Sequence, residues 1–107
     1  MTTFDKREEA FEKKFALDEQ QKFKAEVRRS RLLGLWAAER LGMTGDAAAA
    51  YAKEVVAADL EEAGDADLVR KLLGDFNSKG VPIAEDLIRA KIAEFAARAA
   101  TEVRAGI

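Results

Sequence analysis

The sequence predicts an all-α protein, a four-helix bundle whose long first helix begins with an arm that is exposed or partly disordered when the protein is free. Two observations support this. Alanine makes up much of the 49% hydrophobic content, and leucine, glutamate, lysine and arginine, all strong helix formers, are frequent. The chain has a single proline and no run of alternating β-branched residues. Its 107 residues make one domain, just large enough to bury its own core.

The first helix is predicted to be long. Nothing between Asp5 and Gln21 breaks a helix, and the segment then continues into the most apolar run of the chain. This run contains Leu32, Leu33, Leu35 and Trp36. Gly42 stands where a glycine commonly ends a helix, and we expect Trp36 to fill the core.

Phenylalanines at the start of this helix form a stripe that the rest of the helix does not continue. Phe4, Phe11 and Phe15 fall within about 40° of one another at 3.6 residues per turn. The next apolar stripe is rotated by roughly 100–140° on the same geometry. It consists of Phe23, Val27, Gly34 and Leu41. Because a helix packed along its whole length would keep one apolar face, we expect residues 1–20 to be an arm and residues 21–107 the body.

Three shorter helices are predicted next, joined by short loops into an antiparallel bundle. The second helix runs from caps at residues 44–46 to about Glu62, and its inward residues are Ala48, Tyr51, Ala52, Val55, Val56 and Leu60. The third begins at Asp65 and ends at residues 77–80, and its inward residues are Leu68, Val69, Leu72, Leu73 and Phe76. After an extended link at residues 81–83, the last runs from about Ala84 to Arg104, and its inward residues are Leu87, Ile88, Ile92, Phe95, Ala96, Ala99 and Val103.

The composition argues against several classes of function. Charged residues make up 36% of the chain but leave a net charge of only -2, so acid and base are interleaved, which does not suit a nucleic-acid binder. Cysteine and histidine are both absent, which removes the thiol nucleophile, the usual general base and the usual metal ligands. No apolar run approaches the roughly 20 residues that span a bilayer. We expect a cytoplasmic protein with no catalytic residue, no metal site and no membrane insertion.

Two charged groups remain for interpretation. The acidic group lacks the spacing of a calcium-binding loop and is typical of a solvated helix end; it consists of Asp59, Glu61, Glu62, Asp65 and Asp67. The basic group is interpreted in the first place as a solvated helix face, and in the second as an attractor of anions or of an acidic partner. It consists of Lys22, Lys24, Arg28, Arg29 and Arg31.

The phenylalanine stripe has two interpretations that the pattern alone leaves open. It folds back on the bundle or pairs with a second copy, or it enters a groove on a different protein. Apolar anchors on a charged helix suit the second mode, in which a helix occupies an existing cleft.

Several short segments carry a resemblance to a known family. They are residues 1–5 (MTTFD), 10–12 (AFE), 14–16 (KFA), 23–25 (FKA), 32–38 (LLGLWAA) and 51–56 (YAKEVV). Over nearly its full length the chain resembles the zeta subunit of the α-proteobacterial F-type ATP synthase, a small inhibitor of ATP hydrolysis by that enzyme. The block at residues 32–38, with its basic lead-in, is the most specific part of the match.

The resemblance implies a four-helix body bearing an N-terminal inhibitory segment, here residues 1–20. That segment would enter a catalytic α/β interface of the soluble head, reach toward the γ subunit and stop rotation in the hydrolytic direction only. The implied apolar anchors are Phe4, Phe11 and Phe15, and the implied flanking contacts are Arg7, Glu8, Glu12 and Lys14. The implied partners are the α, β and γ subunits, which would hold the protein peripheral to the inner membrane.

Two alternatives accompany this reading. In the first, the body senses a nucleotide through Arg28, Arg29 and Arg31 and so regulates the arm; weak nucleotide binding is then the one ligand expected, with no resident cofactor. In the second, the phenylalanine stripe forms the interface of a helical homodimer.

Overall fold

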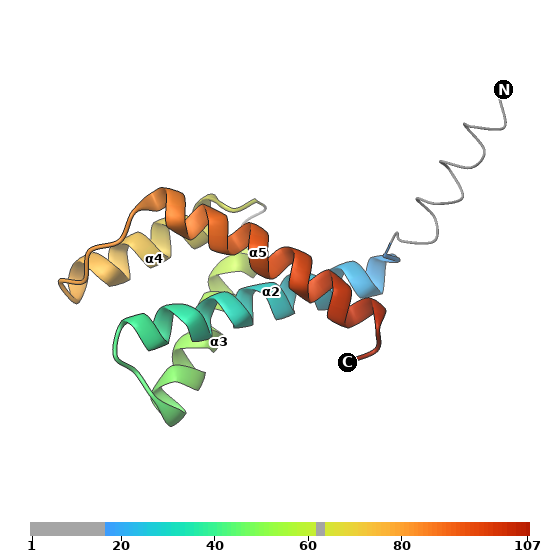
Figure 1. Ribbon diagram of the computed structural model, residues 1–107, viewed down its shortest axis with the longest axis horizontal. Helices are drawn as coiled ribbons and strands as arrows, with labels where there is room; N and C mark the ends of the chain where they lie inside the picture. Colours follow the sequence, from blue (N-terminus) through green and yellow to red (C-terminus); the bar gives the residue numbers. More distant parts are fainter. Residues whose placement is uncertain (1–16, 62–63) are drawn as a thin grey trace, which may run out of the picture.

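The computed structural model describes residues 17–61 and 64–107, which form four helices (Figure 1). In chain order they are α2 (Glu19–Arg40), α3 (Gly45–Glu61), α4 (Ala66–Ser78) and α5 (Glu85–Arg104). The described ranges hold no strand, so the predicted all-α, four-helix fold is confirmed. The predicted ends of the last three helices agree with the structure to within about two residues.

Helix α2 lies at the centre of the fold, because both α3 and α5 pack along it (Figure 1). Side-chain pairs show that these neighbours run antiparallel to α2. Ser30 and Gly34 of α2 face Asp59 and Ala52 of α3, respectively, so the two sequences run in opposite directions along the contact. On the other side, Arg28 pairs with Glu102 near the end of α5, while Lys91 lies over the Trp36 ring. Helix α4 packs against α3 and α5 and closes the bundle.

The start of α2 differs from the expected unbroken first helix. Residues 17 and 18 are not helical, and Asp18 is the N-cap of α2. Its carboxylate accepts a hydrogen bond of 2.8 Å from the backbone N–H of Gln21, and the side-chain oxygen of Gln21 accepts one of 3.2 Å from the backbone N–H of Asp18. This reciprocal pair satisfies backbone donors that a continuous helix would use internally, so α2 begins at Glu19. The rotation between the two apolar stripes assumes one continuous helix, so it is not defined across Asp18.

The core is a single cluster to which all four helices contribute. Its fully buried members include Leu33, Leu68, Leu72, Phe76 and Ile88. Trp36 does not fill the core as expected. It is partly buried and packs against the cluster, with its ring 6.5 Å from that of Phe76.

Two further apolar residues are exposed: one belongs to the second apolar stripe of the first helix, and the other was predicted to face inward. Phe23 is 55% exposed and Leu60 is 51% exposed. Phe23 lies almost two turns before Ser30, which already faces the last turn of α3, so α2 extends beyond its partner helix there. At Leu60 the inward position is occupied instead by its neighbour Asp59, which is 2% exposed.

Candidate functional site

The residues that the resemblance assigns to the partner interface all lie outside the described residues. They are Phe4, Arg7, Glu8, Phe11, Glu12, Lys14 and Phe15. What the structure describes is the region that these residues lead into: the capped start of α2, the arginines of its third and fourth turns, and the helices that those arginines contact.

Arg29 is the centre of the strongest polar cluster in this region. Its guanidinium donates from Nη2 to Asp59 Oδ1 at 3.0 Å and from Nη1 to Asp65 Oδ1 at 3.0 Å. Ser30, fully buried, donates from Oγ to Asp59 Oδ2 at 2.9 Å. Both carboxylate oxygens of Asp59 thus have partners, which a charge with a side chain only 1% exposed requires. The cluster joins α2, the end of α3 and the residue before α4.

This arrangement corrects the sequence interpretation of both charged groups. Asp59 was predicted to lie at a solvated helix end, but it is buried. Arg29 was first interpreted as part of a solvated face, yet its side chain is only 15% exposed. A signal for Asp59 was present: it follows Val55 by four residues and Ala52 by seven, which places it on the buried face of α3.

Glu26 lies one helical turn before the cluster, and the charges of the cluster shift the pKa of its carboxyl. Desolvation by burial raises the pKa of the Glu26 carboxyl above its ordinary value, and the nearby negative charge of Asp59 raises it further. Arg29 acts in the opposite sense, but its guanidinium is already shared between two carboxylates. Three carboxylates therefore surround one arginine, and the pKa of Glu26 lies above its ordinary value although this side chain is exposed.

The other two candidate arginines differ from Arg29 and from each other. Arg28 lies 3.5 Å from the Glu102 carboxylate and also donates to the backbone carbonyl of Ile107, which holds the end of the chain against α2. Arg31 is exposed, and within the described ranges no carboxylate pairs with it. The three residues are thus not gathered into one anion-binding cluster.

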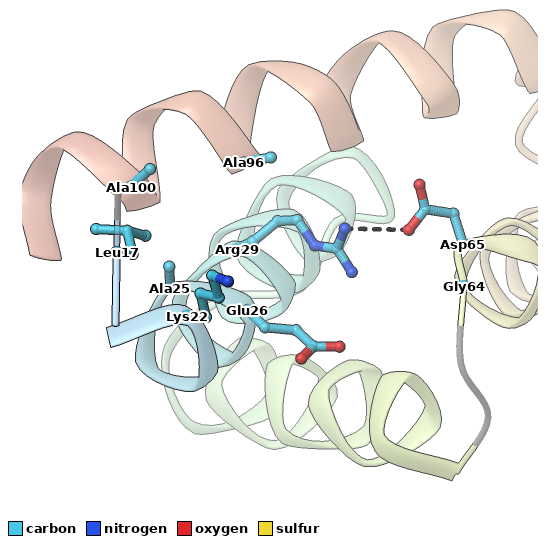
Figure 2. Close-up of a pocket in the computed structure, with 9 residues that line it drawn as sticks. All are labelled: Leu17, Lys22, Ala25, Glu26, Arg29, Gly64, Asp65, Ala96 and Ala100. Atoms are coloured by element: carbon cyan, nitrogen blue, oxygen red, sulfur yellow. Dashed lines mark hydrogen bonds and ion pairs between the residues drawn. The ribbon is translucent and has the colours of Figure 1, made fainter. Parts of the chain in front are cut away.

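A cavity of about 440 Å³ borders the Arg29 cluster (Figure 2). Figure 2 shows Leu17 and Ala100 at one end and Arg29 with Asp65 at the other, with Lys22 and Glu26 between them. Two cations and two carboxylates face this space, and both terminal nitrogens of the Arg29 guanidinium donate to protein carboxylates. The described side chains include no cluster of metal-ligating groups. Of the charged side chains at the cavity, Arg29 and Asp65 join α2 to the start of α4, whereas Lys22 pairs with Glu19 within α2.

The comparisons with known proteins extend these observations. The family described as ATPase inhibitor subunit zeta matches residues 1–102. A solution NMR structure of a protein is 49% identical in sequence, covers 79% of this chain and 96% of its own, and superposes with a TM-score of 0.69. A search of curated proteins finds no match to the chain.

Fold and polar cluster together define a small four-helix protein whose ionic groups hold helices together. The match to residues 1–102 then assigns the chain: it belongs to the family of ATPase inhibitor subunit zeta. Membership gives it a role as an inhibitor of the ATP synthase, to which it binds, and makes it an inhibitor subunit instead of a catalytic one. None of the described helices is long and apolar enough to cross a membrane.

Proposed function

We propose that the chain inhibits ATP hydrolysis by inserting its N-terminal residues, about 1–20, into a catalytic α/β interface of the soluble head of the F-type ATP synthase. The inserted segment stops rotation in the hydrolytic direction by steric means, with no covalent chemistry. It reaches toward the γ subunit, so that the contacts involve the α, β and γ subunits.

One observation carries the proposal: the capping box at Asp18 and Gln21 starts the body's first helix independently of the residues before it. The buried apolar residues of the described ranges lie between Ala25 and Ala99. Within the described residues, the body therefore has its own helix start and its own core.

The phenylalanine stripe supplies the proposed binding energy. Phe4, Phe11 and Phe15 are the anchors, and each fully buried phenylalanine contributes about 1.5–3 kcal/mol. The flanking charges set the register in the cleft, since charged pairs contribute more to specificity than to affinity. These flanking residues are Arg7, Glu8, Glu12 and Lys14.

A deletion of residues 1–16 tests the proposal. The deletion stops before Leu17 because Asp18 and Gln21 must keep their reciprocal hydrogen bonds, whose loss would cost about 1 kcal/mol and confuse the result. We expect the intact protein to inhibit ATP hydrolysis by an α-proteobacterial synthase head and the shortened protein not to inhibit it. Far-UV circular dichroism and a urea melt of both proteins control for folding. Full inhibition by the shortened protein would show that residues 1–16 are not the inhibitory segment.

Single substitutions test the anchors. Phe4→Asp and Phe15→Asp each bury an unpaired charge if the phenylalanine is an anchor, so inhibition should weaken by at least roughly a hundredfold, or about 3 kcal/mol. Ala10→Asp is the matched control, because it adds the same charge at a helical position away from the stripe. Equal inhibition by all three variants would remove the anchor assignment.

The nucleotide-sensing alternative gains no support from the described contacts, because Arg28 and Arg29 already bind carboxylates of the protein. It stays a hypothesis. Titration with ADP or ATP, followed by Trp36 fluorescence, tests it, and a saturable response is required to keep it.

A further inference from the structure

A groove runs along the surface between α2 and α3, on side chains that the proposed inhibitory segment does not use. One part is a cavity of about 330 Å³ that the two helices line together. A second hollow, of about 290 Å³, continues it toward the start of α2 and shares Val27 and Arg31 with the first. We call the whole the α2–α3 groove. It is lined by Phe23, Lys24, Val27, Arg28, Arg31 and Leu35 of α2 and by Ala49, Ala52, Lys53 and Val56 of α3.

The shape of the groove follows from small residues at the helix crossing. A β-carbon added to Gly34 would lie only 2.6 Å from the Ala52 Cα, so the two backbones approach closely there. On the α3 side, the small side chains of Ala49 and Ala52 leave the space of the groove open. On α2 the wall is a row at every fourth residue from Phe23 to Leu35, a length of about 18 Å at 1.5 Å per residue. That length matches about three turns of a docked helix.

The apolar part of the groove is open to solvent. Phe23 is 55% exposed, among the most exposed of the large hydrophobic side chains in the described ranges. Val27, Leu35 and Val56 are each partly exposed along the same line. Phe23 and Val27 lie on one side of Arg31, and Leu35 with Val56 on the other. Exposed apolar side chains next to charged ones are typical of a protein-binding surface.

The border of the groove carries positively charged side chains that form no ion pair within the described part of the body. Lys24, Arg31 and Lys53 are exposed, and none has a carboxylate partner among residues 17–61 and 64–107. Most other cations of the body do pair with a carboxylate. They include Lys22, Arg28, Arg29, Arg70, Lys71, Arg89, Lys91 and Arg98. Three cations without a carboxylate partner therefore lie beside the apolar side chains of the groove, and their charge is complementary to an acidic partner.

We propose that the α2–α3 groove docks an acidic amphipathic helix on the head of the ATP synthase, with apolar side chains on the row from Phe23 to Leu35 and carboxylates against Lys24, Arg31 and Lys53. This inference rests on the proposed function and adds a second contact to it: the body binds the enzyme while the N-terminal segment enters the interface. The chain's own residues 1–16 fit less well, because their four acidic and four basic side chains carry no net charge to complement the border.

The test compares two full-length triple variants with the same total charge. Lys24→Glu/Arg31→Glu/Lys53→Glu reverses the border of the groove. Its matched control, Arg70→Glu/Lys79→Glu/Arg89→Glu, reverses three exposed cations on α4, the following turn and α5. A third variant, Phe23→Ser, removes the exposed aromatic ring without changing charge. Binding to the soluble head is measured directly by interferometry, and inhibition of ATP hydrolysis is measured in parallel.

We expect the groove reversal and Phe23→Ser to raise the Kd for the head about tenfold or more, and the control to change it by less than about threefold. Maximal inhibition at saturating protein should be unchanged, because the N-terminal segment is intact. The affinity of the wild type should fall as salt rises, and that of the groove reversal should respond less. Circular dichroism melts confirm that each variant is folded.

The outcomes separate this inference from the function on which it rests. If the wild type inhibits and the groove reversal binds as well as the control, the groove is not a docking surface and the inhibitory role stands. If the wild type binds through the groove without inhibiting, the docking surface stands and the inhibitory mechanism fails. If the wild type does not bind, both fail. A dimer that the groove reversal dissociates, or a spin label at residue 4 that broadens signals from Phe23 to Leu35 in the free protein, would assign the groove to a second copy or to the chain's own N-terminus and overturn the proposal.

Discussion

Replacement of Arg29 by methionine removes one of the two charges in the best-buried ion pair of the body while keeping most of the side chain's volume. Asp59, with its side chain 1% exposed, would keep only the hydrogen bond from Ser30. Breaking a buried pair from one side costs about 3–5 kcal/mol, because the remaining charge has neither water nor a partner. Unfolding free energies of domains of this size are about 5–15 kcal/mol, so we expect the melting temperature to fall by roughly 12–20 °C.

The carboxylate side of the pair should be less sensitive. In Asp59→Asn, Arg29 keeps Asp65 at 3.0 Å and the site loses a charge instead of gaining an unpaired one, so we expect a cost of about 1–2 kcal/mol. Combined with Arg29→Met, it should partly rescue stability, since a buried amide is less costly than a buried carboxylate. The double variant should therefore be more stable than Arg29→Met alone.

Urea unfolding followed by far-UV circular dichroism measures all three variants against the wild type and completes a double-mutant cycle. A cost below about 1 kcal/mol for Arg29→Met would mean that water reaches Asp59. Costs that simply add in the double variant would mean that the two side chains do not depend on each other. Either result would refute the reasoning from burial.

Two further predictions concern backbone packing and pH. Gly34→Ala should lower stability, because its β-carbon would lie 2.6 Å from the Ala52 Cα. Gly74→Ala should instead raise stability by up to about 1 kcal/mol through helix propensity, because a β-carbon there meets nothing within 4 Å. Thermal melts of the two variants check both predictions. The raised pKa of Glu26 means that its ionised form opposes folding, so its favourable contribution is full below the ordinary value of 4.5 and is lost as the pH rises through the higher folded-state value. Glu26→Gln should therefore be more stable than the wild type at neutral pH and not at about pH 3.5, and equal melting temperatures at neutral pH would contradict the influence of Asp59.

The sequence predicted the helices better than the environment of their individual residues. Gly42 and Gly80, both with positive φ, end helices where expected, and the link before α5 is not helical. These features depend on local chemistry, in which a glycine or a proline acts within a few residues. The break at Asp18 was also local, and a capping box with Gln21 three residues on was readable in the sequence.

Burial of polar residues depended on partners distant in the chain. Asp59 is buried because Arg29 and Ser30, about 30 residues earlier, face it across the helix pair. Hydrophobicity favours Leu60 over Asp59, whereas helical phase places Asp59 on the buried face of α3. The pairing of α2 with α3 supplies the partners that allow its burial. Phe23 is exposed for a related reason: its position on α2 is in phase with the core residues, but α3 ends before reaching it. Periodicity reports which face a residue occupies and not where the neighbouring helix stops.

The central position of α2 also has a mechanical consequence. Tension on the residues before Asp18 is transmitted to the start of α2, and α3 and α5 pack against that helix on two sides. Such a load acts in shear: the Arg28–Glu102 and Arg29–Asp59 pairs and the apolar contacts beyond them are strained together. A helix pulled at a right angle to its neighbours would instead lose its contacts one after another. We therefore expect the body to resist unfolding when the N-terminal segment is pulled.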